Sequence, residues 1–339
     1  MAIARNIALT AGFLLAGCGT VQELLGIITN DGGSLDAGLT TGDSGSGADA
    51  GNASDAGSDV VAEAGADAEA GAPPCDTTKP FGAPVILAEL QSSASEGGLR
   101  LLPDELTGFF WSTRPGGPGT ANLYVTTRPD RTSLFGSVTL LDNVNATGTF
   151  QLDPTGATNG LTLVFRSIRG DAGGGDDLYS ATRSDTDAAF SQVTALATLD
   201  STLNDVQPFL TADGTEVYYA SNRTGNYDIY RATVQGGTFG VPTPVSELNE
   251  GGVDDADPVL SFDRLTVFFA STRPGLGSSD IWTATRTSTA AAFGTPTNVT
   301  ELNSTMQDDP TWLSADGCRL YMSVGTMPST HEYVATRPQ

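Results

Sequence analysis

The sequence predicts an all-β fold, a five-bladed β-propeller with four antiparallel strands in each blade, from three observations. A segment of about 50 residues recurs along the chain, and repeats of this length are typical of propellers and arrays. The repeats consist of short apolar runs between Gly and Asp turns, without a sustained helical period. The two ends of the chain are out of phase with the repeat. Together these observations predict a closed ring of sheets with almost no helix.

The core of the repeat is Ser-x-Arg, followed after a short Gly-rich gap by Asp-Ile-Tyr or a close variant. Ser-x-Arg ends the second strand of each blade, and the second motif begins the third strand. A degraded fifth copy stands at Ser323-Val-Gly325 with Glu332-Tyr333. The four full copies are Ser112-Thr-Arg114 with Asn122-Leu-Tyr124, Ser167-Ile-Arg169 with Asp177-Leu-Tyr179, Ser221-Asn-Arg223 with Asp228-Ile-Tyr230, and Ser271-Thr-Arg273 with Asp280-Ile-Trp282.

The third copy shows most clearly how one repeat divides into four strands. A short apolar strand at 208–210 is followed by the turn Thr211-Ala-Asp-Gly214, in which Gly supplies a positive φ. Strands are then expected at 216–221, 227–233 and 239–248. Four short strands joined by such turns are what one antiparallel propeller blade requires.

The phase of the repeat predicts how the ring closes. The fourth strand of a blade begins with Phe-Gly or a variant, and an extra copy, Phe81-Gly82, precedes the first Ser-x-Arg. The chain stops at Arg337-Pro-Gln339, before the last blade has received its fourth strand. We therefore expect the N-terminal strand at about 83–91 to complete the C-terminal blade, which removes exposed sheet edges. The regular copies are Phe135-Gly136, Phe190-Ser191, Phe239-Gly240 and Phe293-Gly294.

The chain begins with a pattern typical of export. Residues 1–17 combine Arg5 with a short apolar stretch, and Leu15-Ala16-Gly17-Cys18 resembles the lipobox of bacterial lipoproteins. The resemblance implies lipidation of Cys18, anchoring in a membrane and, because Gly19 follows, sorting to the outer membrane. The alternative is an ordinary secretory signal that contains a cysteine.

The sequence predicts that residues 18–78 form a disordered tether and that residues 79–339 form the propeller. From Gly19 to Pro74 the chain is rich in Gly, Ala, Ser and acids and contains no Lys or Arg, so it cannot bury enough apolar surface to fold. The formal net charge of the chain is −24. This charge argues against nucleic acid as a partner, because nucleic acid binding needs clustered positive charge.

Two cysteines remain once Cys18 is assigned to lipidation. Cys75 precedes the closing strand, and Cys318 begins the second strand of the blade that this strand should complete. Export places both in an oxidising compartment, so we expect a Cys75–Cys318 disulfide. Two unlinked thiols are the alternative.

A family resemblance follows from the fourth repeat. The pattern Asp-Pro-x-Leu-Ser-x-Asp, continuing to Phe-x-Ser-x-Arg and Asp-Ile-Trp over Asp257 to Trp282, resembles the WD-like repeat of TolB-type β-propellers. The resemblance covers about residues 80–339 and implies the propeller fold. TolB itself has six blades and an N-terminal domain, so its role in envelope transport is not carried over.

Acidic residues are expected to gather at one mouth of the channel, where the loops entering the first strands meet those between second and third strands. The candidates for binding a cation or a polar ligand such as a sugar or peptide are Asp205, Asp255, Asp257, Asp308 and Asp309. The structural alternative is that such acids pair with the repeat arginines and hold the blades together. The residues predicted to form repeated structural pairs are Arg114, Arg169, Arg223, Asp228, Arg273 and Asp280.

The sequence predicts a non-catalytic binding or scaffold module rather than an enzyme. His331 is the only histidine, and no Gly-x-Ser-x-Gly motif is present, which argues against a Ser-His-Asp hydrolase. The alternative is a glycosidase that uses channel-mouth carboxylates. We expect no cofactor, although a structural or channel-bound cation such as calcium would fit. The expected protein is a monomer in the cell envelope, held to the membrane by its lipid, with a protein, peptide or glycan as ligand.

Overall fold

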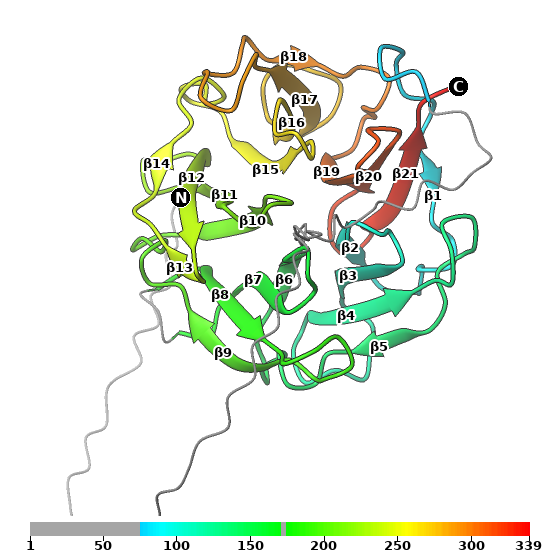
Figure 1. Ribbon diagram of the computed structural model, residues 1–339, viewed down its shortest axis with the longest axis vertical. Coiled ribbons are helices and arrows are strands. Elements are labelled where there is room, and N and C mark those ends of the chain that lie inside the picture. Colours follow the sequence, from blue (N-terminus) through cyan, green and yellow to red (C-terminus); the bar gives the residue numbers. More distant parts are fainter. Residues whose placement is uncertain (1–74, 171–173) are drawn as a thin grey trace, which may run out of the picture. The chain divides into compact units, whose positions relative to one another are not determined.

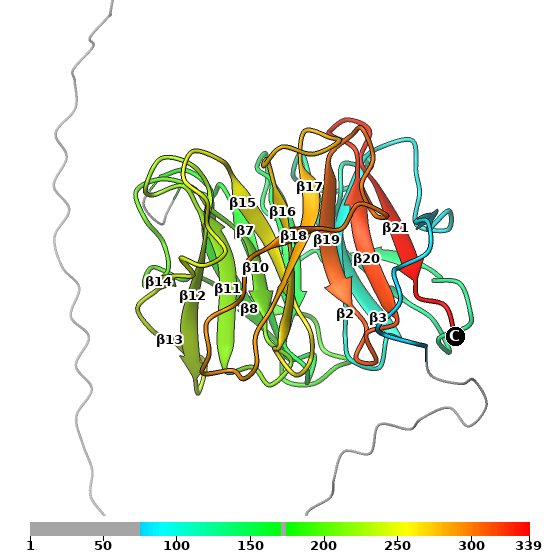
Figure 2. The same cartoon turned by 90° about the horizontal axis from the view of Figure 1, so that it is seen from above.

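The computed structural model describes residues 75–170 and 174–339, which form five antiparallel β-sheets around a central axis (Figure 1). Each sheet is one blade of a propeller, and its strands run between the two faces of the ring (Figure 2). The predicted five-bladed fold is therefore confirmed. No helix within the described ranges has the length and hydropathy of a membrane span. The predicted signal segment, Cys18 and nearly all of the predicted tether lie outside the described residues.

Blades 1 to 4 hold their strands in chain order from the axis outward, whereas blade 5 takes β1, from the start of the described chain, as its outermost strand. Blade 1 contains β2 (Glu96–Leu101), β3 (Thr107–Ser112), β4 (Asn122–Thr127) and β5 (Val138–Leu140). Blade 2 contains β6 (Gln151–Gly156), β7 (Thr162–Ser167), β8 (Asp177–Thr182) and β9 (Ser191–Ala195). Blade 3 contains β10 (Asp205–Leu210), β11 (Glu216–Ser221), β12 (Asp228–Gln235), β13 (Thr238–Phe239) and β14 (Thr243–Pro244). Blade 4 contains β15 (Asp255–Leu260), β16 (Thr266–Ser271), β17 (Asp280–Thr285) and β18 (Thr297–Asn298). Blade 5 contains β19 (Asp308–Leu313), β20 (Arg319–Val324), β21 (His331–Thr336) and β1 (Val85–Ile86).

The turn between the first two strands of a blade is determined by local side chains. In blade 3 the Asp213 carboxylate accepts hydrogen bonds from the backbone N and the hydroxyl of Thr215 at 3.1 and 2.8 Å. Gly214 adopts a φ of 64°, which an L side chain rarely takes. The following strand, β11, is then buried almost throughout. A polar turn followed by an apolar strand thus places the second strand of the blade inside the molecule.

The outermost strands are shorter than the sequence predicts. The fourth strand expected at 239–248 is divided into two short segments, β13 and β14, and β18 has only two residues. Prolines interrupt both regions, at Pro242 and Pro244 in blade 3 and at Pro296 in blade 4. Because proline has no N–H to donate to a ladder, it limits pairing at these edges.

The ring closes as the phase of the repeat predicts. Strand β1 pairs antiparallel with β21, with Val85 opposite Val334 and Ile86 opposite Tyr333. The ladder is shorter than the expected 83–91, because residues 88–90 form a turn. The first strand of the described residues therefore lies at the edge of the last blade, beside β21 (Figure 1).

Phe81 and Gly82 reproduce the contacts of the other Phe-Gly pairs. The Arg337 guanidinium lies 4.1 Å from the centre of the Phe81 ring, as Arg128 lies 4.6 Å from that of Phe135. The backbone N of Gly82 donates to Thr336 O at 2.9 Å, the same bond that follows each Phe-Gly copy in blades 1, 3 and 4. The closing strand is thus held by the contacts that hold the fourth strand in the other blades.

The predicted disulfide joins Cys75 to Cys318, with the two Cα atoms 5.7 Å apart. The backbone N of Asp76 also donates to Pro338 O at 3.0 Å. Residues 75–78 were assigned to the tether from the sequence. The bridge and the hydrogen bond attach them to blade 5, so the attached segment begins at Cys75 in the described part of the chain.

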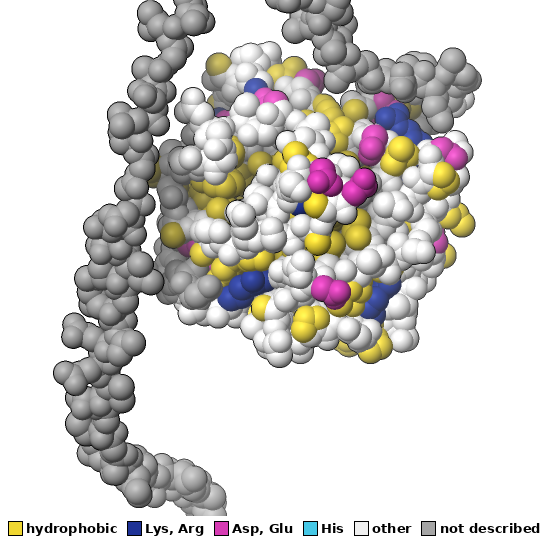
Figure 3. All heavy atoms as spheres, turned by 60° about the horizontal axis from the view of Figure 1, so that its bottom comes forward, with side chains coloured by type: hydrophobic (Ala, Val, Ile, Leu, Met, Phe, Trp, Pro, Cys, Tyr) yellow, Lys and Arg dark blue, Asp and Glu magenta, His cyan; other side chains and the backbone are white. Residues whose placement is uncertain are grey.

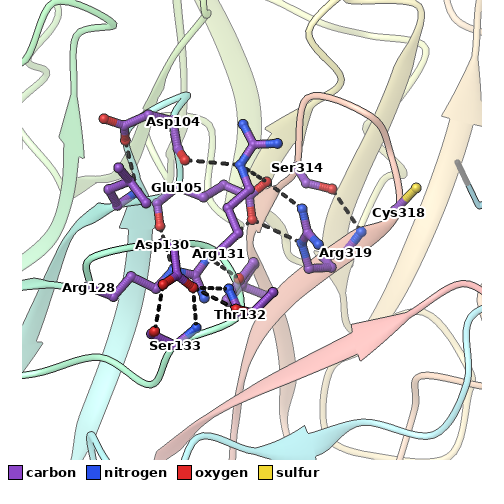
Figure 4. Close-up of polar contacts among 12 residues, drawn as sticks. Asp104, Glu105, Arg128, Asp130, Arg131, Thr132, Ser133, Ser314, Cys318 and Arg319 are labelled. Atoms are coloured by element: carbon purple, nitrogen blue, oxygen red, sulfur yellow. Dashed lines mark hydrogen bonds and ion pairs between the residues drawn. The ribbon is translucent and has the colours of Figure 1, made fainter. Parts of the chain in front are cut away.

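A buried carboxylate supports the same seam between blades 1 and 5. Glu105, in the turn after β2, is 1% exposed and lies among three guanidinium groups (Figure 4). Its carboxylate is 2.6 Å from Arg319 of blade 5, and 3.3 and 3.7 Å from Arg128 and Arg131 of blade 1. The contact with Arg319 joins the first complete blade to the last.

The seam between blades 3 and 4 uses the same contact with the charges exchanged. Arg264 occupies the turn position of Glu105 and, like it, has a positive φ. Its guanidinium lies 3.3 Å from Glu216 of blade 3, and Glu216 begins β11 as Arg319 begins β20. Blade contacts therefore depend on which charged residues stand at two equivalent positions.

Candidate ligand-binding channel

The arginines of the Ser-x-Arg motif bind blades 1 to 4 to the loops that enter them. Arg223 donates from Nη2 to Leu199 O at 2.7 Å and to Asp205 at 2.6 Å, and its guanidinium lies over the Tyr230 ring. Arg114 and Arg273 make the same contacts in blades 1 and 4, with Leu90 and Leu248 as carbonyl acceptors. Arg169 of blade 2 also donates to a carbonyl, that of Val144.

Asp205 and Asp255 are partners of these arginines rather than free ligand groups. Asp255 accepts from Glu250 N at 2.7 Å and pairs with Arg273 at 3.3 Å. Burial raises the pKa of Asp255. Both carboxylates are fully buried, so their first role is to stabilise the entry of their own blade.

Asp308 holds the equivalent position in blade 5, which lacks the arginine. Its carboxylate accepts from Ser304 N at 2.7 Å and from the Ser304 hydroxyl, and burial raises its pKa. A serine thus replaces the arginine as its donor.

Asp228 and Asp280 organise the loop between the second and third strands. Asp280 accepts from the backbone N of Leu276 and Gly277 at 2.8 and 2.9 Å, and Asp228 accepts from the Thr224 hydroxyl at 2.6 Å. The arginine of the same blade pairs with the acid that begins the first strand instead. The two recurring charges therefore have separate structural partners.

The side chains that line the axis come from a bulge in the innermost strands. The ladder between first and second strands shifts at this bulge in all five blades. Asp153, Gln207 and Asp257 stand at the bulge in blades 2, 3 and 4, with φ values of 51°, 54° and 47°. Such conformations are rare for residues other than Gly and cluster at functional sites. The bulge aims these polar groups into the channel.

A cavity of about 160 Å³ occupies the polar end of the channel. Its wall combines side chains of all five blades. An apolar cavity of about 30 Å³, which includes Phe209, Phe262 and Trp312, lies beyond Arg100 toward the other face. Arg100 lines both cavities and separates the polar end from the apolar one. The charged, amide and aromatic residues of the polar cavity are Arg100, Trp111, Asp153, Arg166, Gln207, Asp257, Gln307 and Asp309.

A side pocket of about 260 Å³ adjoins the axial cavity at blade 4 and shares Arg166, Asp257 and Asp309 with it. Ala270 lines this pocket from the repeat position directly before the Ser of Ser-x-Arg. Blades 1 and 2 carry Trp111 and Arg166 there, whereas blade 4 carries Ala270. The Trp111 indole lies so close to Gly97 that a Cβ there would collide with it.

The carboxyls of Asp257 and Asp309 resist ionisation. Burial, followed by the charges of Asp309 and Asp153, raises the pKa of Asp257 well above its usual range. Burial also raises the pKa of Asp309 to about 7, against a hydrogen bond from Gln307 that lowers it. Gln207 Nε2 donates to Asp257 at 2.6 Å, and Gln307 Nε2 donates to Asp309 at 2.7 Å. Each acid is thus oriented by one glutamine, Asp257 by Gln207 and Asp309 by Gln307.

The two arginines of the channel differ in their pairing. Arg166 lies 2.7 Å from Asp153 and 2.9 Å from Asp176, which raises its pKa against the opposing effect of burial. Arg100 forms no ion pair with any residue in the described ranges, and burial lowers its pKa to about 10. Its guanidinium lies 5.2 Å from the centre of the Phe209 ring.

Of the predicted ligand candidates, the channel brings together only Asp257 and Asp309. Reasoning from sequence did not find Asp153, Arg166 or Arg100. One signal could have found Asp153, because each polar residue that precedes a proline of an innermost strand lines the cavity. These pairs are Asp153-Pro154, Gln207-Pro208, Asp257-Pro258 and Asp309-Pro310.

Among the described residues, one group of three carboxylates is compact enough to share a metal ion. Asp177, Asp200 and Asp205 bring ligand atoms within 4.8 Å of one another in blades 2 and 3. Asp205 is already bound to Arg223. The group lies apart from the axial cavity, whose lining contains none of the three.

Asp200 stands where blades 1, 3 and 4 have asparagine. In blade 1, Asn145 accepts from Leu123 N at 2.7 Å and returns a bond from Nδ2 to Leu123 O at 3.0 Å. Asp200 keeps the first bond, from Leu178 N, but an ionised carboxylate cannot donate the second. Burial raises the pKa of Asp200 to about 7.

Asp200→Asn is therefore expected to stabilise the protein at neutral pH by about 1 kcal/mol, the net value of one hydrogen bond. Because the folded pKa of about 7 exceeds an unfolded value near 3.9, the wild type loses stability as pH rises between about 4 and 7. The advantage of the variant should grow over this interval, as measured by urea unfolding in EDTA.

The reciprocal change Asn145→Asp in blade 1 is the matched control and should destabilise the protein with the same pH dependence. An Asp200→Asn variant that is less stable than the wild type throughout this pH range would contradict the assignment.

The Lys and Arg side chains visible in Figure 3 are separated from one another, and some lie beside acidic side chains. The described residues drawn on that side form no continuous basic patch of the kind that nucleic acid binding requires. The observation agrees with the acidic net charge.

Comparisons with known proteins support the fold of the chain but identify no family. No known protein family and no curated protein match the sequence. Among solved structures, the TolB of Acinetobacter baumannii is 18% identical with a TM-score of 0.43, covering 74% of this chain and 57% of its own. A thermostable family-43 glycoside hydrolase is 14% identical with a TM-score of 0.50, covering 72% and 88%. An α-L-arabinofuranosidase from Lactobacillus brevis is 12% identical with a TM-score of 0.51, covering 72% and 90%.

At these identities a structural likeness shows the fold alone. The blades have the four-stranded form that the resemblance to TolB-type repeats implies. The glycosidases share that propeller architecture, which hosts unrelated functions. The structure shows a five-bladed β-propeller, and the comparisons support the fold without fixing a function.

Proposed function

We propose that the chain is a non-catalytic binding module of the cell envelope whose ligand enters the polar end of the channel and the side pocket of blade 4. One observation carries the proposal. Oriented polar groups of several blades converge on a cavity of about 160 Å³ that continues into a pocket of about 260 Å³. A concave site with a few placed polar groups is the usual form of a small-ligand site.

The location rests on the N-terminal sequence, which lies outside the described residues. The lipobox-like Leu15-Ala16-Gly17-Cys18 supports a lipid anchor, and Gly19 supports the outer membrane. The Cys75–Cys318 disulfide fits an oxidising compartment. In this proposal a monomeric propeller stands off the membrane and presents its channel to a protein, peptide or glycan.

A glycosidase is the second candidate, and one observation favours it. Asp257 and Asp309 come from different blades, line one cavity and have raised pKa values, as expected of a catalytic acid. A retaining pair would need carboxyls about 5 Å apart and an inverting pair about 6.5–9.5 Å. The scaffold is favoured by Asp205 and Asp255, which pair with arginines of their own blades.

Filling the side pocket provides the test. Ala270→Trp introduces at blade 4 the residue that blade 1 carries at Trp111. We expect the wild type to bind a component of an envelope glycan and peptide panel, and the variant to lose at least about tenfold in affinity through exclusion. Val241→Trp, at a residue 79% exposed on the outer edge, is the matched control and should bind normally. Affinity is measured by calorimetry on the folded variants.

The same panel separates the two functions. Release of reducing sugar by the wild type, lost in both Asp257→Asn and Asp309→Asn, would replace the binding proposal with the glycosidase. Equal affinities of wild type and Ala270→Trp would remove the channel as the site.

A further inference from the structure

Arg100, at the floor of the axial cavity, is a buried cation without an ion-pair partner among the described residues. Its side chain is on β2, the residue is 3% exposed, and Nε and Nη1 have no hydrogen-bond acceptor among the described residues. The carboxylates of Asp257, Asp153 and Glu332 act on its pKa through space, but none of them forms an ion pair with it. Leaving a buried guanidinium unpaired is costly. The cavity therefore has a place for an anionic group.

Other parts of the cavity wall have acceptors without donors. Asp309 Oδ1 and Gln207 Oε1 are buried and have no hydrogen-bond donor among the described residues, although the other polar atom of each group is engaged. The hydroxyl of Thr311, two residues after Asp309 on β19, likewise has no hydrogen-bond partner among the described residues. The proximity of Asp309 raises the pKa of Asp257, and a cation between the two carboxyls would favour their ionised forms. The wall therefore has a place for a cationic donor.

Neither charge alone would satisfy the site. A simple anion would meet Arg100 but face the acids, whereas a simple cation would meet the acids and leave Arg100 unpaired. Arg166 does not alter this balance, because Asp153 and Asp176 already pair with it. The cavity is complementary to a molecule that carries both charges a few atoms apart.

Size limits the molecule further. The axial cavity of about 160 Å³ has room for roughly five water-sized groups, comparable to an amino group, its carbon and a carboxylate. The side pocket of about 260 Å³ begins beside Asp257 and Asp309 and is lined in part by Tyr227, Ala256 and Ala270. It can take a side chain that branches from the charged part.

We infer that the channel binds a free α-amino acid, whose carboxylate pairs with Arg100, whose ammonium group lies against Asp309 and Asp257, and whose side chain enters the blade 4 pocket. The inference rests on the proposed binding function and specifies its ligand. No bond is made or broken in this binding.

The test uses pairs of compounds that differ by one charge. L-Alanine and L-glutamine are titrated into the folded propeller by calorimetry, together with N-acetyl-L-alanine, which lacks the ammonium, and L-alaninamide, which lacks the carboxylate. The two amino acids should bind, and each blocked compound should bind at least about tenfold more weakly, since each loses a charged hydrogen bond. The dipeptide Ala-Ala, whose charges are further apart, should also be weaker and distinguishes a peptide end from a free amino acid.

Two variants assign the charges to their residues. Arg100→Met should abolish the preference for L-alanine over L-alaninamide while keeping the preference over N-acetyl-L-alanine, and Asp309→Asn should do the reverse. Arg100→Lys, which keeps the charge, should retain part of the first preference. These ratios within one variant are insensitive to a general loss of stability.

Each outcome bears on the inference. Equal binding of L-alanine and both blocked compounds overturns it, as does the absence of amino acid binding to the wild type. Binding of a glycan or peptide that Ala270→Trp abolishes, without amino acid binding, overturns the inference and leaves the proposed function standing. If the wild type binds neither amino acids nor any glycan or peptide of the panel, both the inference and the proposed function are overturned.

Discussion

Replacing Cys75 and Cys318 with serine is expected to lower the free energy of unfolding by about 3–5 kcal/mol. The bridge closes a loop of 243 residues, and cross-links that close long loops restrict the unfolded chain most. It also attaches the segment that leads into β1, whose ladder with β21 has only two residue pairs. The wild type, the double variant and the reduced wild type are compared by urea unfolding.

The reductant itself is the control, because dithiothreitol should destabilise the wild type and leave the double variant unchanged. A wild type that unfolds at the same urea concentration before and after complete reduction, verified by alkylation of both thiols, would show that the bridge does not stabilise the fold.

Glu105→Gln is expected to cost about 3–5 kcal/mol of stability, the range found when one partner of a buried ion pair is removed. The change keeps the shape of the side chain but removes the charge that compensates Arg319 and Arg128 (Figure 4). Glutamine is preferred to glycine here because Glu105 has a φ of 63°, so Glu105→Gly would relieve backbone strain at the same time. Urea unfolding again measures the effect.

Asp104→Asn is the matched control for this prediction, since Asp104 is the exposed neighbour in the same turn. It should change stability by no more than about 0.5 kcal/mol. If both variants lose the same amount, the buried carboxylate does not hold blades 1 and 5 together. Arg319→Met combined with Glu105→Gln should cost less than the sum of the single changes, because the two groups interact directly.

The ring and its closure could be predicted because they depend on residues that repeat. Phe81-Gly82 matches the other Phe-Gly pairs, and the structure gives it the same arginine and the same backbone bond. The length of β1 could not be predicted in this way. The motif marks where a fourth strand begins, whereas its extent depends on pairing at an edge.

The channel could be predicted only in part, because its residues depart from the repeat. Asp205 and Asp255 were predicted as ligand candidates from their place in the loops that enter the first strands. Both form ion pairs with the arginine of their own blade. Whether a side chain faces the axis depends on the bulge, which turns Asp153 into the channel, and the bulge leaves no clear pattern in sequence beyond the following proline. Arg100 could not be found, because no other blade has an arginine at its place in the innermost strand.

The closing strand has a consequence for the order of events during synthesis. Cys75 and the strand after it are made early, but their partners in blade 5 follow about 243 residues later. At about 5–20 residues per second, the ribosome needs roughly 10–50 s to supply them. Until then no blade 5 exists, and the open ends of the growing sheet array can pair with other chains. The pairing of β1 with β21 therefore cannot form until the last strand has been made. We expect the unclosed sheets to need protection from aggregation up to that point.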